Sequence, residues 1–148
     1  MFGTMQRGVQ AYAKVGLESS AVAASPHELI VMLFDGALTA IQGARHNMKL
    51  GKIPEKGVAI SHAIQIINDG LRASLDKKAG GEIAASLDSL YQYMTNRLLQ
   101  ANLNNAPDML DEVHGLLSDL RDAWLAIGKK PAAAADSAPG PASILASA

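Results

Sequence analysis

The side chains that could hold a metal ion or carry protons are four histidines, in a chain of 148 residues without cysteine. Asp111 and His114 have the carboxylate-x-x-His spacing of di-iron helical bundles, which need two such pairs and two further inward-facing carboxylates. The remaining three histidines have alanine or glycine at the corresponding position: His27, His46 and His62. We therefore expect no metal site and no cofactor, and we interpret His114 as a solvated or edge residue of its helix.

The segment His46-Asn47-Met48-Lys49 allows a second interpretation. Phosphorelay proteins that carry phosphate on histidine are also four-helix bundles, and they expose a histidine followed by an apolar residue, lysine and glycine. Here Lys49 lies three residues after His46, but Gly51 is displaced and ends the helix. An exposed histidine in a terminal helical turn explains the segment better, so a phosphorelay bundle that uses His46 is the alternative function.

Other catalytic patterns are missing from the sequence. Nothing places a serine nucleophile on a strained turn, and no glycine-rich phosphate loop is present. Without cysteine, thiolate catalysis and disulfides are excluded. The pair Gly80-Gly81 lies between two predicted helices, where it indicates a helix stop. The sequence therefore predicts a protein that is not an enzyme.

Composition also excludes several kinds of partner. The formal net charge is −1, which gives no electrostatic reason to bind nucleic acid or an anionic membrane. The N-terminus has no apolar core of a secretory signal. The longest purely apolar run covers residues 29–34, far short of the roughly 20 residues that a membrane span needs. We expect a soluble, cytoplasmic protein without membrane insertion.

The helix that contains this apolar run begins at a well-marked position in the sequence. Ser25 is a good N-cap, and Glu28 stands three residues later, where its carboxylate can reach back to the Ser25 N–H. Pro26 falls at the first helical position, where a missing N–H costs nothing. An apolar run follows at once, so the pattern predicts a buried helix that starts here.

Four helical patterns of about 20 residues follow one another, at residues 26–50, 54–75, 82–104 and 106–127. Each carries apolar residues at steps of three and four. Asn105 is suited to cap the fourth helix. Short connections make successive helices antiparallel neighbours. The sequence therefore predicts an all-α fold, an antiparallel up-down-up-down four-helix bundle over residues 25–127.

The two ends of the chain lie outside this bundle. Residues 128–148 are rich in Ala, Pro, Ser and Gly, and we expect this tail to be disordered. Residues 1–24 are predicted to form a short N-terminal helical cap or lid, because Met5, Val9 and Tyr12 recur at steps of four and three. Gly8 and Gly16 weaken that helix. The segment therefore lies in a groove or is partly detached.

Charge and apolar surface leave alternatives open. Residues 106–127 contain five carboxylates against Arg121, which suits either a solvated outer face or a docking face for a basic partner. The apolar faces of the first three helices are wider than a bundle seam needs. They are either ordinary core or grooves for an amphipathic partner segment. A structural homo-oligomer would use the same grooves on itself.

Several spaced motifs, in order over residues 11–127, resemble the flagellar export chaperone FliS family. They are Ala11-Tyr12-Ala13-Lys14-Val15, Ala24-Ser25-Pro26-His27, Met32-Leu33-Phe34-Asp35-Gly36-Ala37, Ile66-Ile67-Asn68-Asp69-Gly70-Leu71, Gly80-Gly81-Glu82-Ile83-Ala84, Leu90-Tyr91-Gln92-Tyr93-Met94 and Arg97-Leu98-Leu99-Gln100-Ala101-Asn102-Leu103. Gln92, Thr95-Asn96 and Asn105 depart from residues common in the family. The resemblance implies a cytoplasmic four-helix chaperone, without enzymatic activity or cofactor. It binds the disordered C-terminal segment of flagellin, prevents premature polymerisation and assists delivery to the flagellar type III export apparatus. Export-gate components are further candidate partners.

This resemblance suggests a set of partner-binding residues: Val9, Tyr12, Tyr91, Tyr93, Arg97, Leu98 and Asn102. Tyrosine combines a large apolar body with a polar tip, and Arg97 offers a polar anchor. Two residues apart on a helix, Tyr91 and Tyr93 cannot face the same direction. The competing interpretation makes Leu98 ordinary core. The N-terminal segment is either a lid that leaves the groove when flagellin arrives or a fixed cap.

Overall fold

The computed structural model describes residues 25–129, and within them the chain forms helices joined by short turns. The helices are α3 (Pro26–Lys49), α4 (Ile53–Gln65), the π-helix η2 (Ile66–Arg72) that continues α4, α5 (Lys77–Asn104) and α6 (Pro107–Lys129). The prediction of an all-α helical bundle is confirmed. The predicted N-terminal cap and nearly all of the predicted disordered tail lie outside the described residues. α6 itself runs two residues past the predicted end of the fourth helix.

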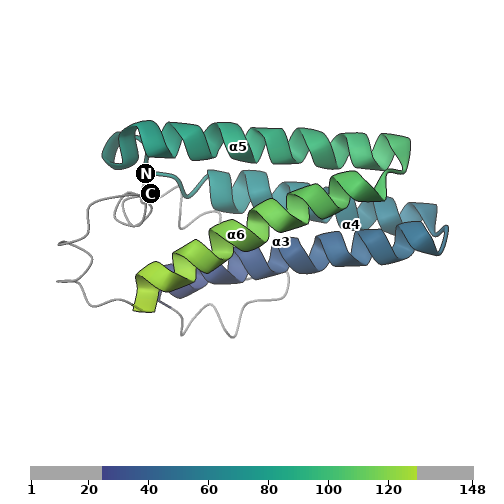
Figure 1. Ribbon diagram of the computed structural model, residues 1–148, viewed down its shortest axis with the longest axis horizontal. Helices are drawn as coiled ribbons and strands as arrows, with labels where there is room; N and C mark the ends of the chain where they lie inside the picture. Colours follow the sequence, from purple (N-terminus) through teal and green to yellow (C-terminus); the bar gives the residue numbers. More distant parts are fainter. Residues whose placement is uncertain (1–24, 130–148) are drawn as a thin grey trace.

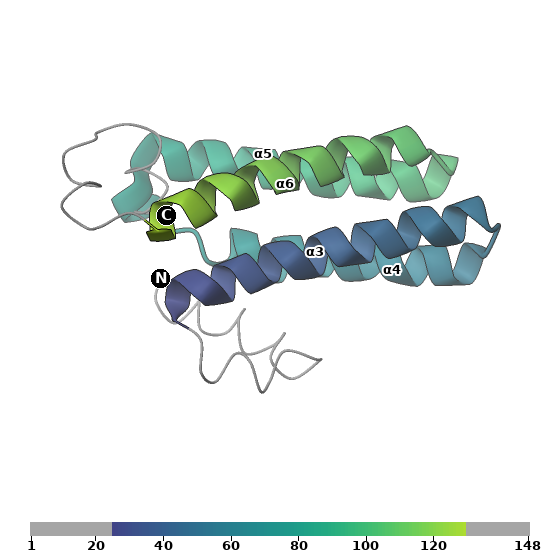
Figure 2. The ribbon, with the colours of Figure 1, turned by 60° about the horizontal axis from the view of Figure 1, so that its bottom comes forward.

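The helices lie side by side along one long axis, and the direction of the chain reverses from α3 to α4 with η2, again to α5, and again to α6 (Figure 1). α3 packs along both α4 and α6, and α5 packs against α6 and η2. Figure 2 shows α5 and α6 together on one side, with α3 and α4 together on the other. α6 starts beside the end of α5 and crosses toward the start of α3 (Figure 1).

The core is built from the inward stripe of each helix, as the spacing predicts. Its largest side chains with almost no exposed surface come from all four long helical segments: Leu33, Ile41, Ile60, Ile67, Met94, Leu98, Leu110, Val113 and Leu117. Burying one such aliphatic side chain contributes about 1.5–3 kcal/mol. The shared stripe, rather than any single contact, therefore holds the bundle together.

The second predicted helix differs from the prediction in its last third. A continuous α-helix over residues 54–75 was expected, whereas the chain winds as a π-helix from Ile66 to Arg72. The wider turn brings adjacent pairs to the core, Ile66 with Ile67 and Gly70 with Leu71. Gly36 of α3 lies opposite, and a Cβ added there would come within 3.3 Å of Ile66 Cδ1. Periodicity in the sequence does not distinguish this winding from an ordinary α-helix.

The first helix start has the predicted cap with one difference in its bonding. Ser25 Oγ accepts from the Glu28 N–H at 3.2 Å. A bond from the Ser25 N–H to the Glu28 carboxylate was expected. Instead, the Ser25 hydroxyl donates to Glu28 Oε1 at 3.0 Å. The two side chains meet directly because the hydroxyl can donate to the carboxylate while it accepts from the backbone.

The two ends of α5 also differ from the prediction. α5 begins at Lys77, five residues before the predicted start at residue 82, and Asp76 is its N-cap. Gly81 interrupts the helix with φ 54° and ψ −129°, a conformation suited to glycine. Asn105 was expected to cap the fourth helix. Instead it adopts the left-handed conformation that ends α5, with φ 53°. Asparagine tolerates this conformation better than most residues, which explains its place there.

Candidate partner-binding surface

One side of α5 faces α6 and carries a polar cluster of Tyr93, Arg97 and Glu112. The Tyr93 hydroxyl donates to Glu112 Oε2 at 2.5 Å, and Arg97 Nε donates to Glu112 Oε1 at 2.8 Å. The Arg97 guanidinium also lies 5.9 Å from the centre of the Tyr93 ring, within cation–π range. The hydrogen bond from Tyr93, followed by the bond from Arg97, lowers the pKa of Glu112. The same carboxylate raises the pKa of Tyr93.

The opposite side of α5 faces the start of α4 and is largely apolar at the surface. Leu103 is 75% exposed and Leu99 is 50% exposed, both on α5, and Ile53 at the start of α4 is 52% exposed. Gly57 of α4 faces Asn102, since a Cβ added to Gly57 would lie 4.0 Å from Asn102 Oδ1. Large apolar side chains at this exposure commonly mark a binding surface when they lie together.

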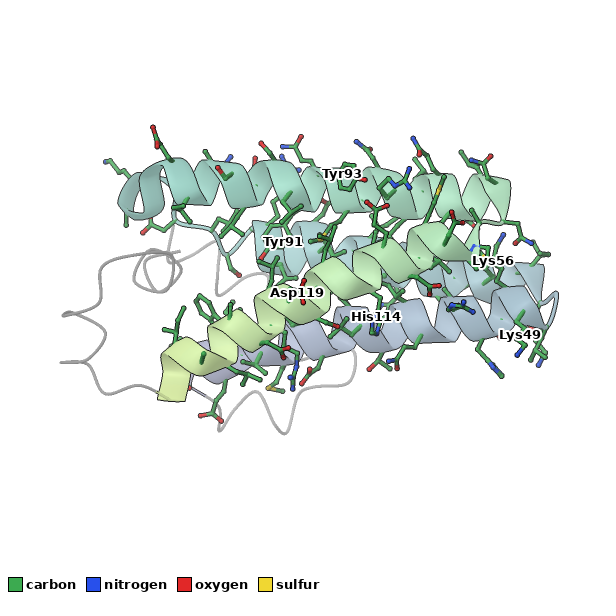
Figure 3. The ribbon with its side chains drawn as sticks, viewed as in Figure 1. Lys49, Lys56, Tyr91, Tyr93, His114 and Asp119 are labelled. Atoms are coloured by element: carbon green, nitrogen blue, oxygen red, sulfur yellow. The ribbon has the colours of Figure 1, made fainter. Side chains whose placement is uncertain are left out.

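A buried lysine joins α4 to this end of α5. Lys56 is 3% exposed, and its Nζ donates to Asn102 O and to Asn105 Oδ1, both at 3.0 Å. Figure 3 shows it where α4 starts and α5 ends. The last carbonyls of a helix lack partners within the helix and carry partial negative charge. Lys56 therefore caps the end of α5 and fixes the position of Asn102.

The predicted partner-binding residues divide among these surfaces and the core. Arg97 and Asn102 are five positions apart, about 140° around the helix. Arg97 meets α6 and Asn102 meets α4, so the structure does not bring them onto one face. Tyr93 is exposed on the side of Arg97. Val9 and Tyr12 lie outside the described residues.

Two of the predicted residues, Tyr91 and Leu98, point into the bundle. Leu98 has no exposed surface, and Tyr91 is buried on the inner side of α5 (Figure 3). Burial raises the pKa of the Tyr91 hydroxyl far above its ordinary value. As the chain is folded here, neither side chain offers surface to a partner. The competing interpretation of Leu98 as ordinary core describes its place.

The acidic fourth helix is engaged by neighbouring cations. Arg45 makes a two-pronged pair with Asp111, through Nε at 2.5 Å and Nη2 at 3.0 Å. These bonds lower the pKa of Asp111. Arg121 bonds Asp35 of α3. Together with Arg97–Glu112, these pairs fix α6 to α3 and α5. The pairs at Asp111 and Glu112 engage two of the five carboxylates that could have formed a docking face for a basic partner.

The ends of α3 and α6 are held by an aromatic contact that the sequence did not indicate. The rings of His27 and Trp124 stack at 5.0 Å with an angle of 6° between their planes. His27 Nε2 lies 2.6 Å from the Trp124 carbonyl oxygen, and Trp124 Nε1 donates to the His27 carbonyl at 3.1 Å. This histidine therefore serves to join helices.

Two buried charged residues were also missed, Lys56 and Asp88. Asp88 accepts from Arg72 at 2.5 Å and from Gln92 at 3.0 Å, and Lys77 Nζ lies at 3.3 Å. Helical spacing to apolar residues in the sequence could have indicated that both are buried. Lys56 stands four residues before Ile60, and Asp88 stands four residues after Ala84 and three before Tyr91, so both fall on the buried stripes.

No group of three or more His, Asp or Glu side chains that could hold a metal ion occurs in residues 25–129. The helices of that region are also too short or too polar to cross a membrane. His114 lies 3.1 Å from the Gln42 side-chain nitrogen, and His46 is exposed. The exposed apolar side chains and the ion pairs of α5 and α6 described above are chemistry that suits the binding of a protein segment.

Comparison with known proteins identifies the family of the chain. A family profile described as "Flagellar protein FliS" matches residues 8–131. The flagellar secretion chaperone FliS of Salmonella typhimurium is 52% identical over 123 residues, which cover 83% of this chain and 91% of that protein. The Escherichia coli protein of the same name is 46% identical over 118 residues (80% and 87%), and that of Bacillus subtilis is 36% identical over 107 residues (72% and 78%). The chain thus belongs to the flagellar protein FliS family, as its sequence motifs had suggested.

Proposed function

We propose that this protein is a cytoplasmic export chaperone that binds the disordered C-terminal segment of flagellin. It prevents premature polymerisation and assists delivery to the flagellar type III export apparatus, where export-gate components are its further partners. The observation that carries the proposal is the family match over residues 8–131, together with relatives named flagellar secretion chaperones. This family assignment gives no support to the alternative of a phosphorelay protein that uses His46.

The surface chemistry agrees with such a cargo. A segment that is striped with apolar residues but too short to fold alone needs an apolar surface to order upon. The exposed Leu99 and Leu103, with Ile53 across the boundary to α4, offer that surface. We propose that the apolar side of the flagellin segment contacts these three residues, which together we call the α4–α5 apolar surface. Asn102 lies on this side of α5 and can pair with backbone groups of the cargo.

The other predicted contacts belong to the edge of the same helix. Tyr93 and Arg97 are exposed or partly exposed and already hold one carboxylate, that of Glu112. They can therefore meet an acidic or amide side chain of the cargo as it crosses α5. We assign Val9 and Tyr12 to a lid that covers the α4–α5 apolar surface until flagellin arrives. Deleting residues 1–17 tightens flagellin binding if the lid only competes, and weakens it if the segment contacts cargo.

The test is calorimetric titration of the full chain with a C-terminal flagellin segment of about 40 residues, long enough for two or three helices, and with a scrambled control. We expect one-to-one binding with a large negative heat-capacity change, because apolar surface is buried as the segment folds. Leu103→Glu should weaken binding at least about tenfold, the effect of about 1.4 kcal/mol.

Val58→Glu is the matched control, since Val58 is 71% exposed but lies on α4 away from this surface. It should leave the affinity unchanged. If neither the segment nor full-length flagellin binds the folded protein, the chaperone proposal is wrong. If Leu103→Glu binds as well as the unaltered chain, the α4–α5 apolar surface is not the cargo site.

A further inference from the structure

A polar groove runs between α3 and α6, away from the proposed cargo surface. Its volume is about 420 Å³, and its lining includes Asp35, Leu38 and Thr39 of α3 and Ser118, Arg121 and Asp122 of α6. We call it the α3–α6 groove. α3 and α6 are the two helices nearest the viewer in Figure 2, with α4 and α5 behind them. The groove and the α4–α5 apolar surface can therefore be occupied at the same time.

The groove is an open position in a ladder of side-chain pairs. Three pairs cross from α3 to α6: Asp35 with Arg121, Gln42 with His114, and Arg45 with Asp111. The two helices are antiparallel, so each step forward on α3 matches an equal step back on α6 (Figure 1). In this register Leu38 comes opposite Ser118, three residues from the first pair on each helix. Leucine has no polar atom to meet the serine, so the ladder lacks a pair here.

The open position leaves hydroxyl groups without a partner above an apolar floor. Thr39 and Ser118 both line the groove, and neither side chain makes a hydrogen bond to another residue within 25–129. Leu38 between them is partly buried and packs against the core. A long side chain with an apolar stem and a polar head matches this combination, because its stem can cover the leucine while its head meets the hydroxyl groups.

Carboxylates outnumber cations around this position. Asp35 and Asp122 line the groove and share one guanidinium group, that of Arg121, which lies 3.8 Å from the Asp122 carboxylate. Asp119, next to Ser118 in the chain, is exposed and has no ion pair in the described part of the chain. Three carboxylates thus face one cation. Such a surface repels phosphate groups and acidic segments and attracts a basic partner.

We propose that the α3–α6 groove binds a basic segment of a second protein through an arginine side chain of that partner. The stem of the arginine lies over Leu38, and its guanidinium group donates to the Asp122 carboxylate and to the hydroxyl group of Ser118. Arginine suits this place better than lysine, because its planar fork of donors can bond a carboxylate through two N–H groups and still reach a further acceptor.

A nuclear magnetic resonance titration of the full chain tests the proposal with a synthetic peptide. The peptide has eight residues, two arginines among alanines, and its control carries citrulline, which keeps the shape of arginine without the charge. The arginine peptide should bind with a Kd of roughly 0.1–1 mM and shift the amide signals of Thr39, Ser118 and Asp122. The citrulline peptide should bind at least about tenfold more weakly. Equal binding of both peptides, or shifts confined to other helices, overturns the proposal.

Variants separate the groove from the overall charge of the protein. Ser118→Arg supplies a cation from the chain itself and should weaken peptide binding at least about tenfold, whereas Asp122→Asn should weaken it about three- to tenfold. Glu55→Gln is the matched control, because it removes one negative charge from an exposed residue of α4. It should change the affinity less than about twofold. Circular dichroism verifies that all three variants are folded. If Glu55→Gln weakens binding as much as Asp122→Asn, net charge alone attracts the peptide and the groove is not its site.

A spin label at Ser118→Cys identifies other occupants, because the chain has no cysteine of its own. Broadening of the signals of residues 1–24 or 130–148 in the same molecule would show that the chain's own segment lies in the groove. Broadening in an isotope-labelled chain mixed with a spin-labelled one would show a second copy there. Either result, or displacement of the arginine peptide by the flagellin segment, contradicts a separate basic partner. Undisturbed signals in both experiments, with peptide and flagellin segment bound together, support it.

Discussion

Replacing Lys56 by methionine should destabilise the protein even though it removes a buried charge. Lys56 has two acceptors in the described part of the chain, Asn102 O and Asn105 Oδ1, each at 3.0 Å, and neither is a carboxylate. Methionine keeps most of the apolar stem and loses the ammonium group. The substitution therefore isolates the capping interaction from the packing of the side chain.

The expected magnitude follows from the two acceptors. Asn105 is exposed, so water can replace the ammonium group at its amide oxygen. The Asn102 carbonyl is partly enclosed, and a buried acceptor left without a donor costs about 1–3 kcal/mol. Loss of a cation at a helix C-terminus adds about 0.3–1 kcal/mol. Methionine also removes the free-energy cost of taking the Lys56 ammonium group out of water, and this part of the change stabilises the folded protein. The net loss should be about 1–2 kcal/mol.

Urea unfolding at neutral pH measures this loss, and thermal unfolding should show a Tm lower by about 3–6 °C. Lys52→Met is the matched control, since Lys52 is exposed four residues earlier and makes no ion pair with a described residue. It should change the free energy of unfolding by less than about 0.5 kcal/mol. If Lys56→Met is as stable as the unaltered chain or more stable, desolvation outweighs the cap and the reasoning about Lys56 is wrong.

Two further predictions concern contacts that join helices. Trp124→Ala should lower the free energy of unfolding by about 2–3 kcal/mol in urea titration, below the range for fully buried aromatics, because Trp124 is partly exposed and its stacking on His27 is lost. Hydrogen bonding from Arg72 lowers the pKa of Asp88, so the stability that Asp88 contributes is present above its unfolded pKa of about 3.9 and is lost as pH falls through the lower folded value. Asp88→Asn should therefore flatten the acid limb of stability against pH below about 4, and an unchanged limb would show that the pair with Arg72 does not contribute.

The helices could be predicted from the sequence because their signals are local or periodic. Ser25 and Pro26 mark a helix start by their own chemistry, and the buried stripe of α6 repeats at steps of three and four. The π-helix of residues 66–72 could not be predicted in this way. Ile66 of this segment lies against Gly36 of α3, and such a contact between packed helices does not show in the periodicity of one helix.

The candidate site was harder to predict because it depends on orientation around one helix. The motif that holds Arg97, Leu98 and Asn102 is contiguous, yet it meets α6, the core and α4 in turn. The resemblance to a family suggests all residues of the motif at once, whereas a binding partner can contact only one side of the helix. The angular position of each residue therefore decides which of them can contact cargo.

This division has a consequence for how the protein can work. Tyr93 and Arg97 are tied to α6 through Glu112, and Asn102 is tied to α4 through Lys56, so α5 is anchored on both flanks. Between these anchors its outer surface retains Leu99 and Leu103 without burying them. Side chains left in water in this way contribute none of the stabilisation that burial would give. A helix held rigidly on both sides presents them in a fixed geometry, so that the ordering cost of binding falls mainly on the incoming segment.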